Sequence, residues 1–181
     1  MKSVIVYESM FGNTEHIARK VAQGLAQPGN DAVLEDVREV GPSDLSATDL
    51  LVVGAPTHAF SLSRQSTRDD AVRQGADPSR ASFGVREWLD TLDAAFPIAA
   101  ERPAVAIFDT RVEKVRRLPG SAAKRAARAL RARGFEVLDR PTSFYVADVK
   151  GPVTFGEFDR AREWGVRLLQ LVQGQRDRDA S

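Results

Sequence analysis

A regular alternation of strand-like and helix-like segments restricts the fold of this chain more than any other feature. Short β-branched or apolar runs alternate with segments in which apolar residues recur at helical spacing. The strand-like runs are residues 2–7, 32–40, 49–54, 104–108 and 135–138, the last resumed at 143–147. The helix-like segments are residues 14–26, 84–92, 122–133 and 154–173, with at most a short helix over 42–47. This pattern predicts an α/β fold with a doubly wound, five-stranded parallel sheet, for which we favour the strand order 2-1-3-4-5.

The predicted strand order also says where a ligand would bind. In such a sheet, the ligand crevice lies beyond the carboxyl ends of the strands, where the winding reverses between the first and third strands. The loops expected at this crevice are residues 8–14, 54–62 and 109–119.

The length and composition suit a single domain. With 181 residues, of which 43% are apolar, the chain can bury the core of one α/β domain and has little room for two. We expect this domain over residues 1–174, followed by a polar tail at 175–181 that frays. Residues 61–82 form its irregular part, with Leu62 and Val72 as their only large aliphatic side chains. A segment of this kind predicts either a mobile surface loop insertion or a lid over the crevice.

The composition also excludes several classes of chemistry. The chain has no cysteine, so disulfides, iron–sulfur clusters and thiol nucleophiles are excluded, and redox work would need a bound cofactor. With His16 and His58 as the only histidines, no metal site is expected. The first apolar run is too short for a signal peptide, and no apolar run approaches a membrane span. We therefore expect a cytoplasmic protein that does not bind membranes.

The net charge of +1 hides a strongly basic segment. Residues 111–133 contain nine Lys and Arg against Glu113 alone, so this segment carries +8 and the remainder −7. One interpretation is a solvated helix face whose apolar side points inward through Ala123, Ala126, Ala127 and Leu130. The others are a docking surface for an acidic redox partner protein or a site for the phosphates of NAD(P)H. Nucleic acid is not expected, because no recognition module accompanies the segment.

The loop after the first strand has the composition of an anion site. It reads Ser9-Met10-Phe11-Gly12-Asn13-Thr14 and leads into the first predicted helix. Free backbone N–H groups and the positive end of a helix dipole would meet there, and three of its side chains could donate to phosphate oxygens. An ordinary helix N-cap would have the same composition. The loop lacks the spacing of a nucleoside-triphosphate loop, and the chain has no dinucleotide fingerprint, which leaves a mononucleotide phosphate.

Together with Gly54-Ala55-Pro56-Thr57-His58-Ala59-Phe60 after the third strand, this loop resembles those of flavodoxin-like proteins. Flavodoxins hold the FMN phosphate with a Ser/Thr-x-Thr-Gly-x-Thr loop, and Ser9, Gly12 and Thr14 match it. Phe11 replaces the central threonine, which makes the loop similar to that of flavodoxin-like NAD(P)H:quinone oxidoreductases. The resemblance implies the flavodoxin-like fold and an FMN cofactor.

By the same resemblance, three loops would contact FMN. The implied residues are Ser9, Met10, Phe11, Gly12, Asn13, Thr14, Pro56, Thr57, His58, Ala59, Phe60, Asp109, Thr110 and Arg111. Phe11, His58 and Phe60 offer flat surfaces for the ring. Trp88 and Trp164 fall on predicted helices, where core packing is the expected role. A cation at Arg111, close to the flavin, would stabilise its anionic reduced form and raise the reduction potential.

Three functions are compatible with these residues. The leading one is an FMN-binding electron-transfer protein with no catalytic residue of its own. The second is an FMN-dependent NAD(P)H:quinone oxidoreductase, which Phe11 and the basic segment favour. The third is an interaction module that keeps the fold without flavin, and Glu8 beside the phosphate loop favours it.

Overall fold

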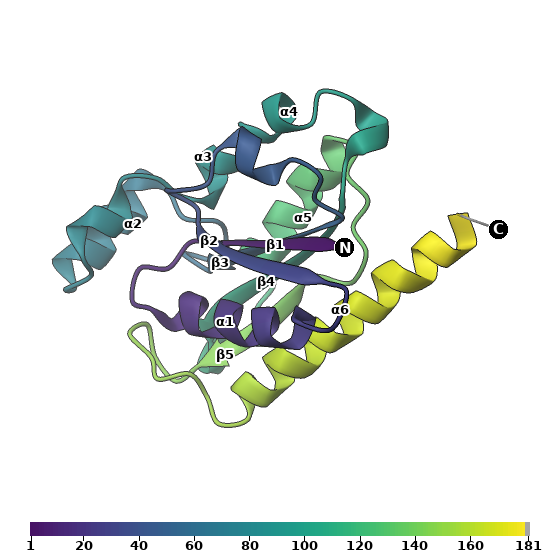
Figure 1. Cartoon of the computed structure of the whole chain (residues 1–181). Helices are drawn as coiled ribbons and strands as arrows, with labels where there is room; N and C mark the ends of the chain where they lie inside the picture. The colour runs from purple at the N-terminus through teal and green to yellow at the C-terminus, as the bar shows by residue number, and fades with distance from the viewer. Residues whose placement is uncertain (180–181) are drawn as a thin grey trace.

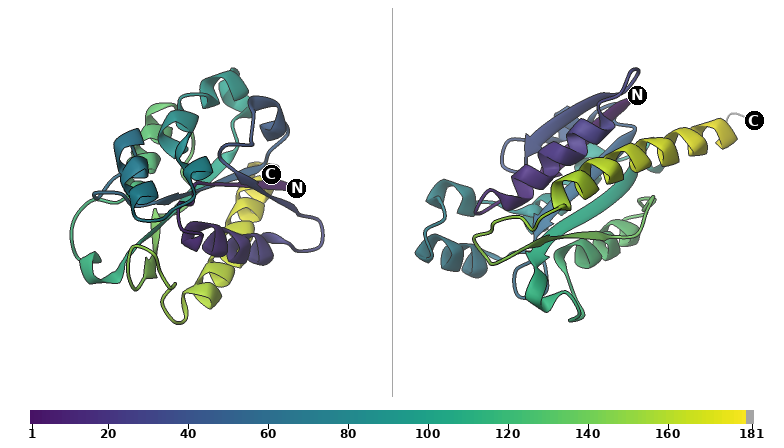
Figure 2. Two further views of the ribbon diagram at one scale, coloured as in Figure 1. Left: turned by 90° about the vertical axis from the view of Figure 1, so that its left-hand side faces the viewer. Right: turned by 90° about the horizontal axis from the view of Figure 1, so that it is seen from below.

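The expected sheet is confirmed. The computed structural model describes residues 1–179 and contains one sheet of parallel strands in the order β2-β1-β3-β4-β5. The strands are β1 (Lys2–Tyr7), β2 (Asp31–Asp36), β3 (Leu50–Pro56), β4 (Ala104–Val112) and β5 (Thr142–Val146). The carboxyl ends of all five strands therefore meet at one edge, which faces the viewer in the left panel of Figure 2.

Helices cover both faces of the sheet (Figure 1). One face carries α1 (Asn13–Leu25) and α6 (Glu157–Asp179). The opposite face carries α3 (Val85–Leu89), α4 (Leu92–Ala95) and α5 (Ala122–Ala132). The remaining helix, α2 (Gln65–Arg73), lies beyond the carboxyl ends of the strands. Short 3₁₀ turns lie at η1 (Pro42–Leu45), η2 (Pro78–Ala81), η3 (Ala99–Glu101) and η4 (Glu113–Val115). No helix in the described part of the chain is long and apolar enough to cross a membrane.

The two faces of the sheet have separate apolar cores, because successive strand residues point to opposite sides. In β1, Val4 and Val6 pack under α3 and α5, whereas Ile5 packs under α1 and α6. Trp88 is buried in the first core and Trp164 in the second, as the sequence predicts. Both tryptophans are thereby kept away from the ligand edge.

Two glycines allow α1 and α6 to cross at very short range. A Cβ atom at Gly24 would overlap the carbonyl oxygen of Arg162, and one at Gly165 would overlap the carbonyl oxygen of Val21. Each glycine therefore faces the backbone of the other helix, and only a hydrogen atom fits between them.

Several element boundaries differ from the prediction. β2 ends at Asp36 rather than at residue 40, because a turn follows it. The side chain of Asp36 accepts from the N–H of Arg38, and its carbonyl accepts from the N–H of Glu39. β3 and β4 run further than expected, to Pro56 and Val112. Of the run 135–138, Val137 alone makes a bridge to β4, so the fifth strand is 142–146. The single helix expected over 84–92 is divided into α3 and α4.

The segments predicted to be irregular contain regular structure. Residues 61–82 include helix α2 and the turn η2, where the sequence offered no helical periodicity. In the tail predicted at 175–181, residues 175–179 continue α6, and residues 180–181 lie outside the described part.

Candidate cofactor-binding site

A pocket opens at the carboxyl edge of β1, β3 and β4, where the winding of the sheet reverses. Its volume is about 290 Å³, near the lower end of the range for small-molecule sites. Eleven of the fourteen residues implied by the resemblance line it: Ser9, Met10, Phe11, Asn13, Thr14, Pro56, Thr57, His58, Ala59, Thr110 and Arg111. Gly12, Phe60 and Asp109 do not line the pocket.

The first wall is the loop of residues 9–14, which leaves its backbone donors free. α1 begins at Asn13, and Gly12 precedes it in the left-handed region with φ 87°. Within residues 1–179, the six backbone N–H groups of this loop have no hydrogen-bond acceptor. The Ser9 hydroxyl accepts from the N–H of Glu15, the next donor along the helix. Unpaired amides at the positive end of a helix form a site for an anion such as phosphate.

Threonine hydroxyls connect the three loops around the pocket. The buried hydroxyls of Thr14 and Thr110 are 2.8 Å apart and hydrogen-bonded to each other. The backbone N–H of Thr57 donates to the carbonyl of Thr110 at 2.9 Å, and its hydroxyl accepts from Ala122 at the start of α5. These bonds fix the loops relative to one another before any ligand binds.

The second wall is a tight hairpin that exposes an aromatic ring. His58 and Ser61 pair through two backbone hydrogen bonds, and Ala59 and Phe60 between them have φ values of 47° and 61°. Burial lowers the pKa of His58, so its imidazole is neutral at pH 7. Phe60, which the resemblance implies as a flat surface for the ring, is 45% exposed and does not line the pocket. Its backbone packs against Gly120 instead, where a Cβ would lie 2.9 Å from the Phe60 carbonyl oxygen.

The third wall contains a buried cation without a carboxylate partner. Arg111 is 5% exposed and donates to the carbonyls of Val115 at 2.6 Å and Leu118 at 3.2 Å. It makes no ion pair with any described residue, and its Nε has no hydrogen-bond partner. A buried guanidinium in this state favours an anionic or electron-rich group in the pocket.

Asp109 has a structural role that the sequence did not predict. Its carboxylate is fully buried and accepts from the backbone N–H of Ala123 at 2.8 Å. This bond caps the first turn of α5 and directs the side chain away from the pocket.

Helix α2 supplies a fourth wall that was missing from the sequence prediction. Thr67, Asp70, Ala71 and Gln74 line the pocket from this helix. Val112, Val146 and Val149 complete the lining from the opposite side. Phe11, expected as a surface for the ring, also packs against a small cluster that joins Met10 to Ala71. The loop of residues 9–14 is thus in direct contact with α2.

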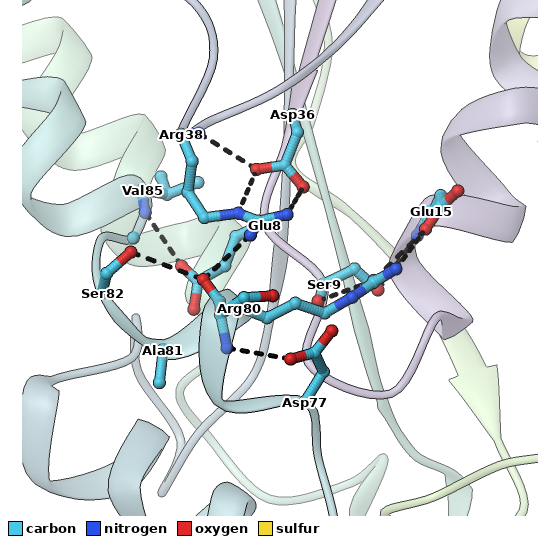
Figure 3. Close-up of polar contacts among 12 residues, drawn as sticks. Glu8, Ser9, Glu15, Asp36, Arg38, Asp77, Arg80, Ala81, Ser82 and Val85 are labelled. Carbon is cyan, nitrogen blue, oxygen red and sulfur yellow. Dashed lines mark hydrogen bonds and ion pairs between the residues drawn. The ribbon is translucent and has the colours of Figure 1, made fainter.

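Two arginines connect η2, at the end of residues 61–82, to neighbouring elements (Figure 3). Arg80 in η2 donates to the carbonyl of Ser9 at 3.0 Å and to the carboxylate of Glu15 at 3.2 Å. Arg38 binds both oxygens of Asp36 at 2.8 Å and donates to the carbonyl of Ser79 at 2.9 Å. Arg80 therefore connects η2 to the pocket loop and α1, and Arg38 connects η2 to the end of β2.

Glu8 directly follows β1 but points away from the pocket. It is 1% exposed, and its Oε2 accepts from the backbone N–H of Val85 at 2.8 Å, while Oε1 has no partner. The fully buried Arg68 beside it donates to Ser63 and forms an ion pair with Glu87 at 3.0 Å. Because that guanidinium is already paired, burial dominates and raises the pKa of Glu8. Glu8 therefore does not oppose an anion in the pocket.

The raised pKa of Glu8 predicts a pH-dependent effect of Glu8→Gln. When the pKa of a carboxyl group is higher in the folded state than in the unfolded state, its contribution to stability is fully present below the unfolded-state pKa, here near 4.5. That contribution is lost as the pH rises through the folded-state pKa. Glutamine does not ionise, so the free energy of unfolding of Glu8→Gln should increase relative to the parent protein between pH 4.5 and 8. Urea titrations across this range measure the difference.

Glu15→Gln provides a control of opposite sign. Despite partial burial, hydrogen bonds from Arg19 and Arg80 keep the pKa of Glu15 below its usual range. The stabilising contribution of Glu15 is therefore fully present above its unfolded-state pKa, near 4.5, and is lost as the pH falls through its folded-state pKa. Glutamine cannot make this contribution, so the free energy of unfolding of Glu15→Gln should decrease relative to that of the parent as the pH rises to 4.5. Parallel curves for Glu8→Gln and the parent would contradict the assignment for Glu8.

The comparisons with known proteins agree with this geometry. The model of the flavodoxin family matches residues 5–79, which include the first two pocket loops and α2. No curated protein matches the sequence. A flavodoxin from the domain Archaea superposes with a TM-score of 0.68 at 19% identity, over 96% of this chain and 99% of that one. A WrbA-like protein from Agrobacterium tumefaciens superposes with a TM-score of 0.65 at 16% identity, over 96% of this chain and 98% of that one.

Another match covers part of a larger protein. Rubredoxin oxygen:oxidoreductase from Desulfovibrio gigas superposes with a TM-score of 0.66 at 18% identity, over 96% of this chain and 36% of that one. An open parallel sheet with helices on both faces, whose winding reverses between β1 and β3, defines the class of doubly wound α/β proteins. Within that class the chain has the flavodoxin-like fold, and the resemblance predicted from its two loops is confirmed.

Proposed function

We propose that this protein binds FMN and transfers electrons between redox partners. The observation that carries the proposal is the set of six unpaired backbone N–H groups in residues 9–14, placed at the start of α1 beside the pocket. A phosphate dianion would satisfy several of these donors at once. When bound, FMN supplies one- and two-electron redox chemistry, which the side chains of this cysteine-free chain cannot supply.

The rest of the pocket suits a flavin ring. Pro56, Ala59, Val112, Val146 and Val149 offer apolar surface, and Thr57 and Arg111 add polar groups from two different loops. Arg111 would hold its positive charge against the polar edge of the ring. A buried cation there favours negative charge on the cofactor and raises its reduction potential.

An electron carrier suits the pocket better than an enzyme does. Among its described lining residues, the titratable side chains are His58, Asp70 and Arg111, and Asp70 is paired with Arg73. Electron transfer needs no general acid or base, so a lining with few titratable groups is sufficient for it. The archaeal flavodoxin named above, similar along the whole chain, supports the same function.

Titration of the purified apoprotein with FMN tests the proposal. We expect saturable quenching of flavin fluorescence with a dissociation constant of about 1 μM or lower, and much weaker binding of riboflavin, which lacks the phosphate. The FMN-loaded protein should not sustain NADPH oxidation with a quinone acceptor. Steady turnover would show that the protein is an NAD(P)H:quinone oxidoreductase instead. Failure to bind FMN would leave the flavin-free interaction module as the remaining function.

A further inference from the structure

The outer face of α5 carries a row of cations. Its inner face is buried as the sequence predicts, through Ala123, Ala126, Ala127 and Leu130. The exposed positions Lys124, Arg125, Arg128 and Arg131 follow the spacing i, i+1, i+4 and i+7, which places them on one side of the helix. Within residues 1–179, none of these four side chains forms an ion pair.

This arrangement does not benefit the helix. Lys124 and Arg125 lie in the first turn, where the helix dipole disfavours cations, and no acidic residue is present in that turn. Lys124 and Arg128 are like charges four residues apart, which repel each other. Arg131 and Arg133 differ, because both lie at the C-terminal end of α5, which favours cations, and Arg133 also pairs with Asp90. The cations at Lys124, Arg125 and Arg128 are therefore not explained by the stability of α5.

The row begins beside the cofactor pocket. The N–H of Ala122, the first residue of α5, donates to Thr57 in the pocket wall. The segment before α5 contains three exposed cations, of which Arg116 pairs with Glu113, whereas Lys114 and Arg117 form no ion pair with any described residue. The same segment contains Leu118, which is 47% exposed. Gly120, two residues later, packs against the backbone of Phe60 in the hairpin of the second pocket wall. Two exposed apolar side chains are thus close to the pocket and accompanied by cations.

We infer that this surface docks an acidic redox protein that exchanges electrons with the cofactor. We call it the basic face and define it by Lys114, Arg117, Lys124, Arg125, Arg128 and Arg131, with Phe60 and Leu118 at its pocket end. The inference rests on the proposed function and identifies the kind of partner. Apolar side chains accompanied by exposed charge are typical of protein–protein interfaces, and the uncompensated positive charge selects an acidic partner.

The spread of the charges favours a protein over a small phosphorylated ligand. Seven residues separate Lys124 from Arg131, which is about 10 Å along the helix axis. These side chains are exposed and do not converge on a pocket. NADPH would need convergent donors around each phosphate group, whereas long-range attraction of a protein requires only complementary charge.

Charge reversal on α5 tests the inference. Lys124→Glu/Arg128→Glu replaces cations at positions where the helix does not need them, and it puts an acid into the first turn, so the variant should fold. The probe is an oxidised, acidic [2Fe–2S] ferredoxin titrated into ¹⁵N-labelled protein at 20 mM and 200 mM NaCl. In the parent we expect amide signals of α5 and of residues 60 and 118 to shift, with affinity decreasing as salt increases. The variant should bind at least about tenfold more weakly at low salt.

Arg140→Glu/Arg162→Glu is the matched control. It makes the same change in net charge at exposed arginines that form no ion pair with described residues and lie outside the basic face. This control should bind ferredoxin like the parent, and all three proteins should bind FMN equally. Since FMN affinity and ferredoxin binding are measured separately, failure of one proposal is distinguishable from failure of the other. Equal ferredoxin binding by the two variants, shifts remote from α5, or saturable shifts of α5 signals by NADPH or duplex DNA would overturn the inference.

Discussion

Gly165→Ala is expected to destabilise the protein by about 3 kcal/mol or more. The added methyl group would overlap the carbonyl oxygen of Val21 and lie 3.1 Å from the Cα of Gly24, so it meets the backbone of α1 on every side. A rotamer change cannot relieve this contact, because a Cβ has no rotamers. The two helices would have to separate, and the apolar contacts around Ile17, Val21 and Leu168 would loosen with them.

Gly174→Ala is the matched control on the same helix. Among the described residues, no atom outside the surrounding helix backbone lies within 4 Å of a Cβ at Gly174, and alanine is the better helix former, so this variant should be unchanged or more stable by up to about 1 kcal/mol. Urea unfolding followed by circular dichroism measures both variants. If Gly165→Ala unfolds at the same urea concentration as Gly174→Ala, the two helices are not held at the close distance described above.

The sheet was predictable because its strands differ in pattern from the helices between them. The run 50–53 is continuously apolar, as suits a strand covered on both faces, and the presence of five such strands favours the order 2-1-3-4-5, which the structure has. The ligand edge was predictable for the same reason, since parallel strands bring their carboxyl ends together. Three loops separated along the chain could therefore be assigned to one site.

Helix α2 could not be predicted in this way. Its largest buried side chain is Arg68, and a charged residue in a segment of mostly polar residues is expected to be exposed. Burial of that residue depends on partners distant in sequence, namely Glu87 and the carbonyl of Ala81. One local signal was available, because the hydroxyl of Thr67 bonds both the N–H and the carbonyl of Arg64 at the start of the helix.

Two carboxylates near the pocket loops, Asp109 and Glu8, have partners that the sequence did not indicate. Asp109 and Arg111 both lie near the end of β4, but Asp109 caps the first turn of α5 whereas Arg111 lines the pocket. Glu8 was read as an obstacle to phosphate because it adjoins Ser9, yet it turns to Val85 on the far side of the sheet. Asp109 and Glu8 each accept from the backbone N–H of a residue at the start of a helix further along the chain, and the local sequence does not reveal these partners.

Asn13→Asp should weaken FMN binding by about 100-fold without destabilising the apoprotein. Asn13 is the first residue of α1 and lines the pocket beside the unpaired N–H groups. An aspartate about 5 Å from a phosphate dianion would repel it by roughly 3 kcal/mol per unit charge at an effective dielectric constant of 20. The same carboxylate interacts favourably with the positive end of the helix, which adds about 0.3–1 kcal/mol to stability. Fluorescence titration and urea unfolding should thus change in opposite directions.

Riboflavin separates a phosphate effect from general damage to the pocket. It carries the same ring without the phosphate, so its weaker affinity should be equal for Asn13→Asp and the parent protein. Equal losses of riboflavin and FMN affinity would mean that the variant distorts the ring site, and unchanged FMN affinity would mean that the phosphate binds elsewhere. A loss restricted to FMN, in a protein at least as stable as the parent, places the phosphate close to the start of α1, because salt at about 0.1–0.15 M screens such repulsion beyond roughly 8–10 Å.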